Sequence, residues 1–121
     1  MNHLRSFNEN VIEIVEIGKR EYVDLHKSAF RNFSDDILKK LRTVSGWYPD
    51  WTFMINNYGC IFMIEDDPEL LPKKIVISEC PDEWYLIKSV GFLKGFRHIP
   101  KYYKCDQADQ LFLMVLSLLK M

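Results

Sequence analysis

The carboxyl-terminal stretch of this chain constrains the fold more than any other. From Leu111 to Leu119 every residue except Ser117 is apolar. A helix that is apolar on every side is expected to be buried, so the chain has to supply a sheet face that receives it. We expect this helix to span about residues 106–120, with Asp106 as its amino-terminal cap. The apolar run is too short to cross a membrane, and no membrane partner is expected.

The segment before this helix predicts two strands and a loop. Residues 74–80 and 83–90 are rich in β-branched and aromatic residues, and Pro81–Asp82 between them is typical of a tight turn. We expect residues 91–103 to form a long loop that leads to the final helix. The two strands then make the floor on which that helix packs.

An amphipathic helix is predicted at about residues 34–45. Ser34 can accept a hydrogen bond from the free N–H groups of the first turn, and Gly46 is expected to end the helix. Residues 52–55 and 60–65 predict two further strands around an Asn/Gly turn. The apolar stripe of the helix consists of Ile37, Leu38, Leu41 and Val44.

Residues 11–25 allow two interpretations. The run 11–17 is dominated by β-branched residues and is followed by Gly18, so a strand–turn–strand hairpin accounts for it. The spacing of Ile14, Ile17 and Leu25 also fits one amphipathic helix. We favour the hairpin.

The chain of 121 residues is expected to form a single domain over residues 1–121, with residues 1–10 loose. The predicted fold class is α+β. It consists of a mainly antiparallel sheet of four to six strands, with two helices (about 34–45 and 106–120) packed on one face.

The net charge and the cysteine content restrict the cellular compartment and the class of partner. The net charge of -1 lacks the positive excess of a dedicated nucleic-acid coat protein. The odd, widely spaced set Cys60, Cys80 and Cys105 is unlike a secreted disulfide framework. No signal-peptide run stands at the amino terminus. We therefore expect reduced thiols in an intracellular, reducing compartment and a protein that is not secreted.

No catalytic or metal motif stands out. The spacing of cysteines and histidines is not that of a zinc site, so no metal and no cofactor are expected. A pair of Cys105 or Cys80 with His98 is the best candidate for a cysteine nucleophile and its base, but neither thiol has an evident activating group. The sequence favours a protein that is not an enzyme, with a small cysteine-dependent enzyme as a second alternative.

A basic and aromatic segment, residues 88–104, is the candidate binding site. Cations and rings alternate there without an acid, which suits an acidic protein partner or, alternatively, single-stranded nucleic acid. Residues 65–83 are mostly acidic, so the molecule would be an electrical dipole if the two segments lay at opposite ends of the sheet. The corner Trp47, Tyr48 and Trp51 is a second candidate. The predicted partner-binding residues are Phe92, Lys94, Phe96, Arg97, His98, Lys101 and Tyr102.

Three features carry a resemblance to a group of known proteins: residues 82–87 (DEWYLI), residues 102–107 (YYKCDQ) and the apolar run from Leu111. This pattern resembles small uncharacterised α+β proteins of large DNA viruses and of some compact or organellar genomes. In those proteins an acidic, aromatic strand leads to a Tyr-Tyr-x-Cys-Asp cap and a closing helix. The resemblance covers about the last third of the chain. It implies architecture and source, and it carries no activity or site.

Together these features predict a small, non-enzymatic binding or structural module. We expect it to contact a protein partner or a larger assembly, or to self-assemble, through residues 88–104. Binding of single-stranded nucleic acid through the same segment is the alternative.

Overall fold

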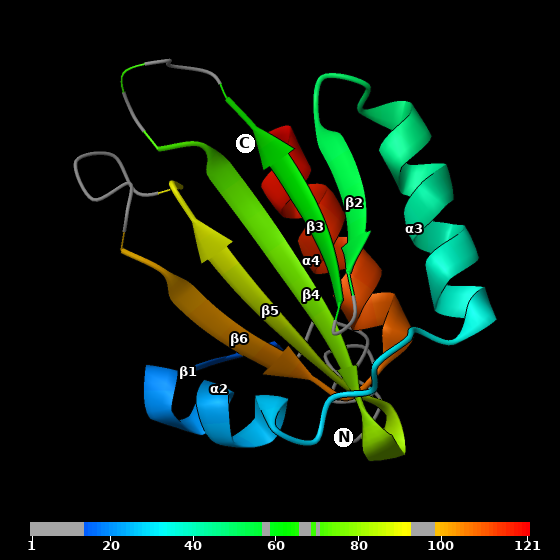
Figure 1. Ribbon diagram of the computed structural model, residues 1–121, viewed down its shortest axis with the longest axis vertical. Coiled ribbons are helices and arrows are strands. Elements are labelled where there is room, and N and C mark those ends of the chain that lie inside the picture. The colour runs from blue at the N-terminus through cyan, green and yellow to red at the C-terminus, as the bar shows by residue number, and fades with distance from the viewer. Residues whose placement is uncertain (1–13, 57–58, 66–68, 70, 93–98) are drawn as a thin grey trace, which may run out of the picture.

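The computed structural model describes residues 14–56, 59–65, 69, 71–92 and 99–121. Strands and helices are interleaved along the chain, and a short 3₁₀ turn joins two of the strands (Figure 1). In chain order the elements are β1 (Val15–Ile17), α2 (Lys19–His26), α3 (Asp35–Trp47), β2 (Thr52–Asn56), β3 (Gly59–Ile64), β4 (Lys73–Cys80), η1 (Pro81–Glu83), β5 (Trp84–Val90), β6 (Lys101–Cys105) and α4 (Ala108–Lys120).

The strands form one six-stranded sheet in the order β1-β6-β5-β4-β3-β2. All neighbouring pairs are antiparallel. At the start of β3 a side chain has no room, because a Cβ on Gly59 would lie 2.1 Å from the carbonyl oxygen of Ile77 on β4. The α+β class and the antiparallel sheet are as predicted.

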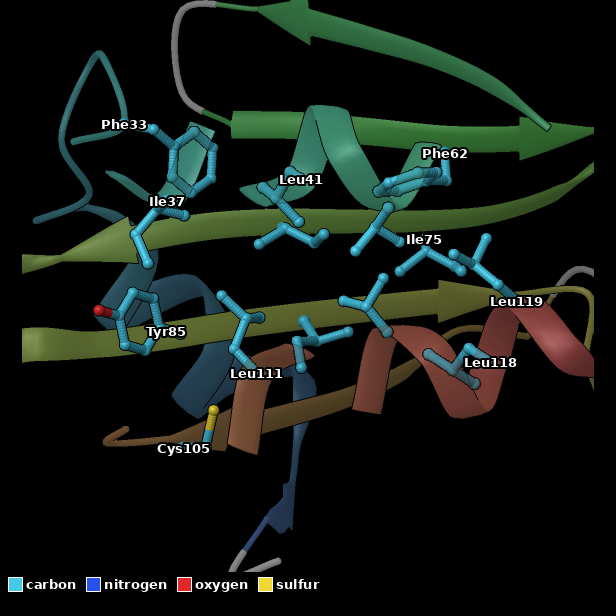
Figure 2. Close-up of a cluster of buried hydrophobic side chains, with 14 of the residues drawn as sticks. Phe33, Ile37, Leu41, Phe62, Ile75, Tyr85, Cys105, Leu111, Leu118 and Leu119 are labelled. Atoms are coloured by element: carbon cyan, nitrogen blue, oxygen red, sulfur yellow. The ribbon is translucent and has the colours of Figure 1, made fainter. Parts of the chain in front are cut away.

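Helices α3 and α4 cover one face of the sheet, as the sequence predicted. Alternate residues of the strands point to this face, including Ile75 and Ile77 of β4 and Ile87 of β5, all with no exposed surface. Leu41 of α3 and Leu111 of α4 are equally buried against them. Figure 2 shows Leu41, Ile75 and Leu111 among the side chains that fill the space between the sheet and the two helices.

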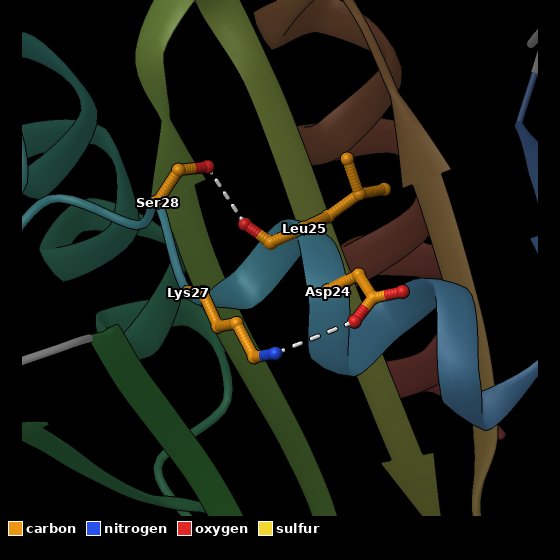
Figure 3. A network of polar contacts seen from close by, with 4 residues as sticks. All are labelled: Asp24, Leu25, Lys27 and Ser28. Atoms are coloured by element: carbon orange, nitrogen blue, oxygen red, sulfur yellow. Dashed lines mark hydrogen bonds and ion pairs between the residues drawn. The ribbon is translucent and has the colours of Figure 1, made fainter.

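Helix α2 lies on the opposite face, across β6, β5 and β4 (Figure 1). Its Tyr22 ring packs on Tyr102 of β6, with 4.7 Å between ring centroids. At the end of the helix Lys27 pairs with Asp24 at 3.6 Å, and the hydroxyl of Ser28 donates to the Leu25 carbonyl at 2.8 Å (Figure 3). This face holds a smaller cluster of buried residues: Ile17, Tyr22, Cys80, Leu86 and Tyr102.

The hairpin prediction for residues 11–25 is wrong in its second half. Val15–Ile17 is a strand, but the chain then turns into α2, with Gly18 at the N-cap. Tyr22 and Leu25, one turn apart, pack against the same cluster, which a helix allows and a strand does not. Residues 11–13 lie outside the described residues.

The predicted loop at residues 91–103 contains a strand that the sequence pattern did not reveal. Lys101–Cys105 forms β6 between β1 and β5. Its two lysines interrupt the alternation of polar and apolar residues that marks a strand in a sequence. In the structure each lysine ammonium lies near an acidic side chain. Lys101 lies 3.8 Å from Glu16, and Lys104 bonds Glu21 at 2.7 Å.

Both predicted helix caps need correction. Ser34 occupies the N-cap of α3 but makes no capping bond with its side chain. Its backbone N–H donates instead to Oε1 of Glu79, on β4, at 2.9 Å. Helix α3 also runs through Gly46 to Trp47, and Gln107, rather than Asp106, is the N-cap of α4. A strand carboxylate therefore takes the role of the capping-box acid, which accepts from the backbone N–H of the N-cap residue.

Among the described residues, no helix has the length and hydropathy needed to span a bilayer.

Candidate interaction surface

A groove runs between the outer sides of α3 and α4. Its volume is about 300 Å³, and its walls are mainly apolar. We call it the α3–α4 groove. It is lined by Lys40, Thr43, Val44 and Trp47 from α3 and by Asp109, Phe112 and Leu116 from α4.

The groove exists because α4 is apolar on more sides than the sheet can cover. Leu111 and Val115 face the sheet and have no exposed surface, whereas Leu113 is 46% exposed. Phe112 and Leu116 are only partly buried. The prediction that this helix is buried on every side is therefore wrong for its outer side. Contiguous exposed apolar side chains of this kind are typical of an interaction site.

Trp47 is the most prominent side chain of the groove. It is 62% exposed, one turn of α3 beyond the buried Val44 that forms part of the groove wall. A tryptophan held on a helix and open to solvent offers a large contact area with little conformational freedom to lose. Such residues dominate the binding energy of protein interfaces.

The charged groups of the groove are one cation and one anion. Nζ of Lys40 lies 5.6 Å from the centroid of the Phe112 ring, within the range of a cation–π interaction. Asp109 stands on α4 about one turn before Phe112. Lys40 and Asp109 line the groove nearer the starts of the two helices, and Trp47 and Leu116 line it further along them.

The predicted corner of Trp47, Tyr48 and Trp51 is divided by the structure. Trp51 is buried and stacks on Phe92, with ring centroids 6.1 Å apart and planes 6° from parallel. Tyr48 is partly buried and packs against the main core. Only Trp47 of the three is exposed.

The predicted partner-binding set is dispersed. Phe92 packs against the core with Nζ of Lys73 5.5 Å from its ring centroid. Tyr102 is buried beneath α2, and its role as a contact residue stays a prediction. Lys101 is partly exposed in its ion pair with Glu16. The other four residues lie outside the described residues: Lys94, Phe96, Arg97 and His98.

The condition for an electrical dipole is not met. Ile64 pairs with Lys73, Lys74 with Val90, and Ser89 with Lys101. The acidic segment that follows β3 therefore leaves the sheet at the same end as the basic segment that follows β5. The described residues that adjoin the acidic and basic segments therefore lie at one end of the sheet instead of at opposite ends.

A second hollow lies on the other face of the sheet. It has a volume of about 180 Å³, and its two lysines, Lys74 and Lys88, are diagonal neighbours on β4 and β5. Among the described residues, no aromatic ring lines it that could stack on the bases of a single nucleic-acid strand. The nucleic-acid alternative stays a prediction that depends on residues 93–98. The other residues of this hollow are Leu71, Pro72, Val76 and Val90.

The two described thiols have the properties of packing groups. Burial raises the pKa of Cys105 to about 12, and its Sγ points to the Gln107 carbonyl at 3.8 Å. Burial also raises the pKa of Cys80, which donates to the Leu25 carbonyl at 3.5 Å. A nucleophilic cysteine needs a lowered pKa, so these environments oppose that chemistry. Within the described ranges, no three potential metal ligands of the His, Cys, Asp or Glu type come together.

Comparisons with protein-family models, curated proteins and solved structures gave no match. The resemblance to viral and organellar proteins thus stays a prediction.

Proposed function

We propose that this protein is a non-enzymatic module that binds a protein surface in the α3–α4 groove. The observation that carries the proposal is the 62% exposure of Trp47 beside the apolar wall of that groove. A monomer gains nothing from exposing a tryptophan there, whereas a docking partner would bury it.

The composition of the groove favours a protein over a small molecule. Small-molecule sites enclose most of their ligand and direct several polar groups at it. In the α3–α4 groove the charged groups are Lys40 and Asp109, and the Trp47 side chain extends into solvent. An elongated apolar groove between two helices fits side chains presented in a row, as on the apolar face of a helix.

The described residues that flank the centre of the predicted basic segment line a hollow of their own. Phe92 and Ile99, which flank residues 93–98, line a hollow together with Met121 at the end of α4. Ile99 is 48% and Met121 68% exposed. Contact with a partner through residues 88–104, as predicted from the sequence, stays a separate proposal, with the groove as the main surface.

Site-specific photocrosslinking in cells of the native source tests the proposal. A benzoylphenylalanine in place of Thr43 in the groove should give protein-sized adducts, and one in place of Lys27 on α2 should not. The Trp47→Ala substitution in the same labelled chain should abolish the adducts from position 43. Equal labelling from both positions, or none from position 43, would refute the groove as a docking surface.

A further inference from the structure

We infer, as an extension of the proposed function, that the occupant of the α3–α4 groove is a second copy of this chain in a twofold-symmetric dimer. The inference rests on three properties of the groove: its balanced charges, the parallel course of its two helices and its exposed apolar surface.

The charged residues of the groove can pair with the same residues of a second copy. Lys40 belongs to α3 and Asp109 to α4, and both line the same groove. A strongly acidic or basic partner would meet one matching and one opposing charge there. A second copy presents the same pair and can match both, which is the requirement for an isologous interface.

The helix directions make that match possible. Both helices run from the end of the sheet where β6 finishes toward the opposite end, upward in Figure 1. A twofold axis parallel to them therefore places α3 of each copy against α4 of the other, with the same direction and at the same height. Lys40 then faces Asp109 of the second copy, and Trp47 faces Leu116 of the second copy.

Burial of the apolar surface would drive such a dimer. Trp47 is 62% exposed, and Phe112 and Leu116 on the opposite wall of the groove are only partly buried. Twofold symmetry buries each of them twice in one interface. The near-zero net charge of -1 leaves little long-range repulsion between copies.

The first test measures self-association of the pure protein by sedimentation across a concentration series. Wild-type protein should show a monomer–dimer equilibrium. Trp47→Ala should raise the dissociation constant about 30-fold or more, as expected for loss of an interface hot spot. Val23→Ala is the matched control, because Val23 is 44% exposed on α2, on the other side of the sheet. Its dissociation constant should equal that of the wild type.

The second test exchanges the charges. Lys40→Glu and Asp109→Lys should each weaken the dimer about 10-fold, because each places like charges opposite one another twice. An equimolar mixture of the two variants should restore wild-type affinity, since every cross-copy pair is again opposite in sign. Rescue by mixing requires pairing between copies and cannot arise from pairing within one chain. Lys39→Glu, an exposed position on α3 outside the groove lining, changes the net charge equally and should have no effect.

The outcomes separate this inference from the proposed function. Suppose that the wild-type protein stays monomeric throughout the series while position 43 gives adducts to a different protein. That result would refute the dimer and leave the proposed docking function in place. A dimer insensitive to Trp47→Ala, or variants that mixing does not rescue, would overturn the α3–α4 groove as the dimer interface. Absence of both dimer and adducts would overturn the inference and the proposed function together.

Discussion

The two faces of the sheet are held to their helices by clusters of very different size. Among the described residues, fifteen buried side chains join the sheet to α3 and α4, and five join it to α2. Since the stabilisation from burial grows with the apolar area removed from water, the larger cluster contributes most of the stability of the fold. The face under α2 is therefore more weakly secured.

The difference indicates two levels of stability in one domain. Elements with few buried contacts open at a lower free energy than the core does. Helix α2 has eight residues and only one buried side chain, Tyr22, so we expect it to detach while α3 and α4 remain packed. The predictions below test this difference, from the largest expected effect to the smallest.

The largest effect is expected in the larger cluster. Leu111→Ala should lower the free energy of unfolding by about 2 to 5 kcal/mol, because it leaves a cavity where a leucine with no exposed surface stood. Leu113→Ala, two residues along the same helix and 46% exposed, is the matched control. Its cost in urea denaturation should stay within about 0.5 kcal/mol. Equal costs would show that α4 does not pack as described.

Local opening of α2 is the second prediction, with cysteine labelling as its measurement. Cys80 lies beneath α2 and Cys105 on the other face, under α4. Tyr22→Ala removes the anchor of α2 and should speed alkylation of Cys80 by iodoacetamide roughly 100-fold, which corresponds to about 3 kcal/mol of lost local stability. Labelling of Cys105, followed by mass spectrometry in the same sample, should not change. Acceleration of both thiols together would mean that the domain opens as one unit.

The raised pKa of Cys105 also sets the pH behaviour in this experiment. An unfolded chain ionises its thiol near the ordinary value of 9.0, whereas the native thiol stays neutral up to about 12. The contribution of the buried neutral thiol is therefore fully present below pH 9.0 and is lost as the pH rises toward 12. Labelling of native Cys105 that is as fast as that of a free peptide thiol at neutral pH would revive the cysteine-enzyme alternative.

A smaller effect is expected where a strand carboxylate caps α3. Glu79→Gln keeps an oxygen that can accept from the Ser34 N–H but removes the negative charge at the positive end of the helix. The free energy of unfolding should fall by about 1 kcal/mol. The exposed control Glu65→Gln should cost less than about 0.5 kcal/mol in the same denaturation experiment. A neutral Glu79→Gln variant would remove the assigned capping role.

Sequence patterns predicted those elements that carry their own signal. The stripe of Ile37, Leu41 and Val44 marked α3, and the apolar run from Leu111 marked α4. The sequence patterns did not predict strand β6, and for residues 19–26 they favoured a strand over helix α2. In β6, Lys101 and Lys104 form ion pairs with Glu16 and Glu21. These partners are distant in the sequence, so the pattern of neighbouring residues does not show them.

The candidate site was harder to predict than the fold. Tyr102 looked like a contact residue because it lies among cations, but α2, remote in sequence, covers it. Trp47 was grouped with Trp51 because they are close in the chain, yet one is exposed and the other is buried against Phe92. The one usable signal for the α3–α4 groove was the excess of apolar residues on α4, which no single sheet face can cover.

The sequence by itself determined the class of fold, because periodicity and turn residues act over a few positions and need no distant partner. Only the tertiary structure decided which side of α4 meets the sheet and which carboxylate caps α3. Those choices depend on the packing of residues far apart in the chain, as in the bond from Ser34 to Glu79, 45 positions away. The surface that remains for a partner, the α3–α4 groove, consists mainly of side chains that this packing leaves exposed or partly exposed.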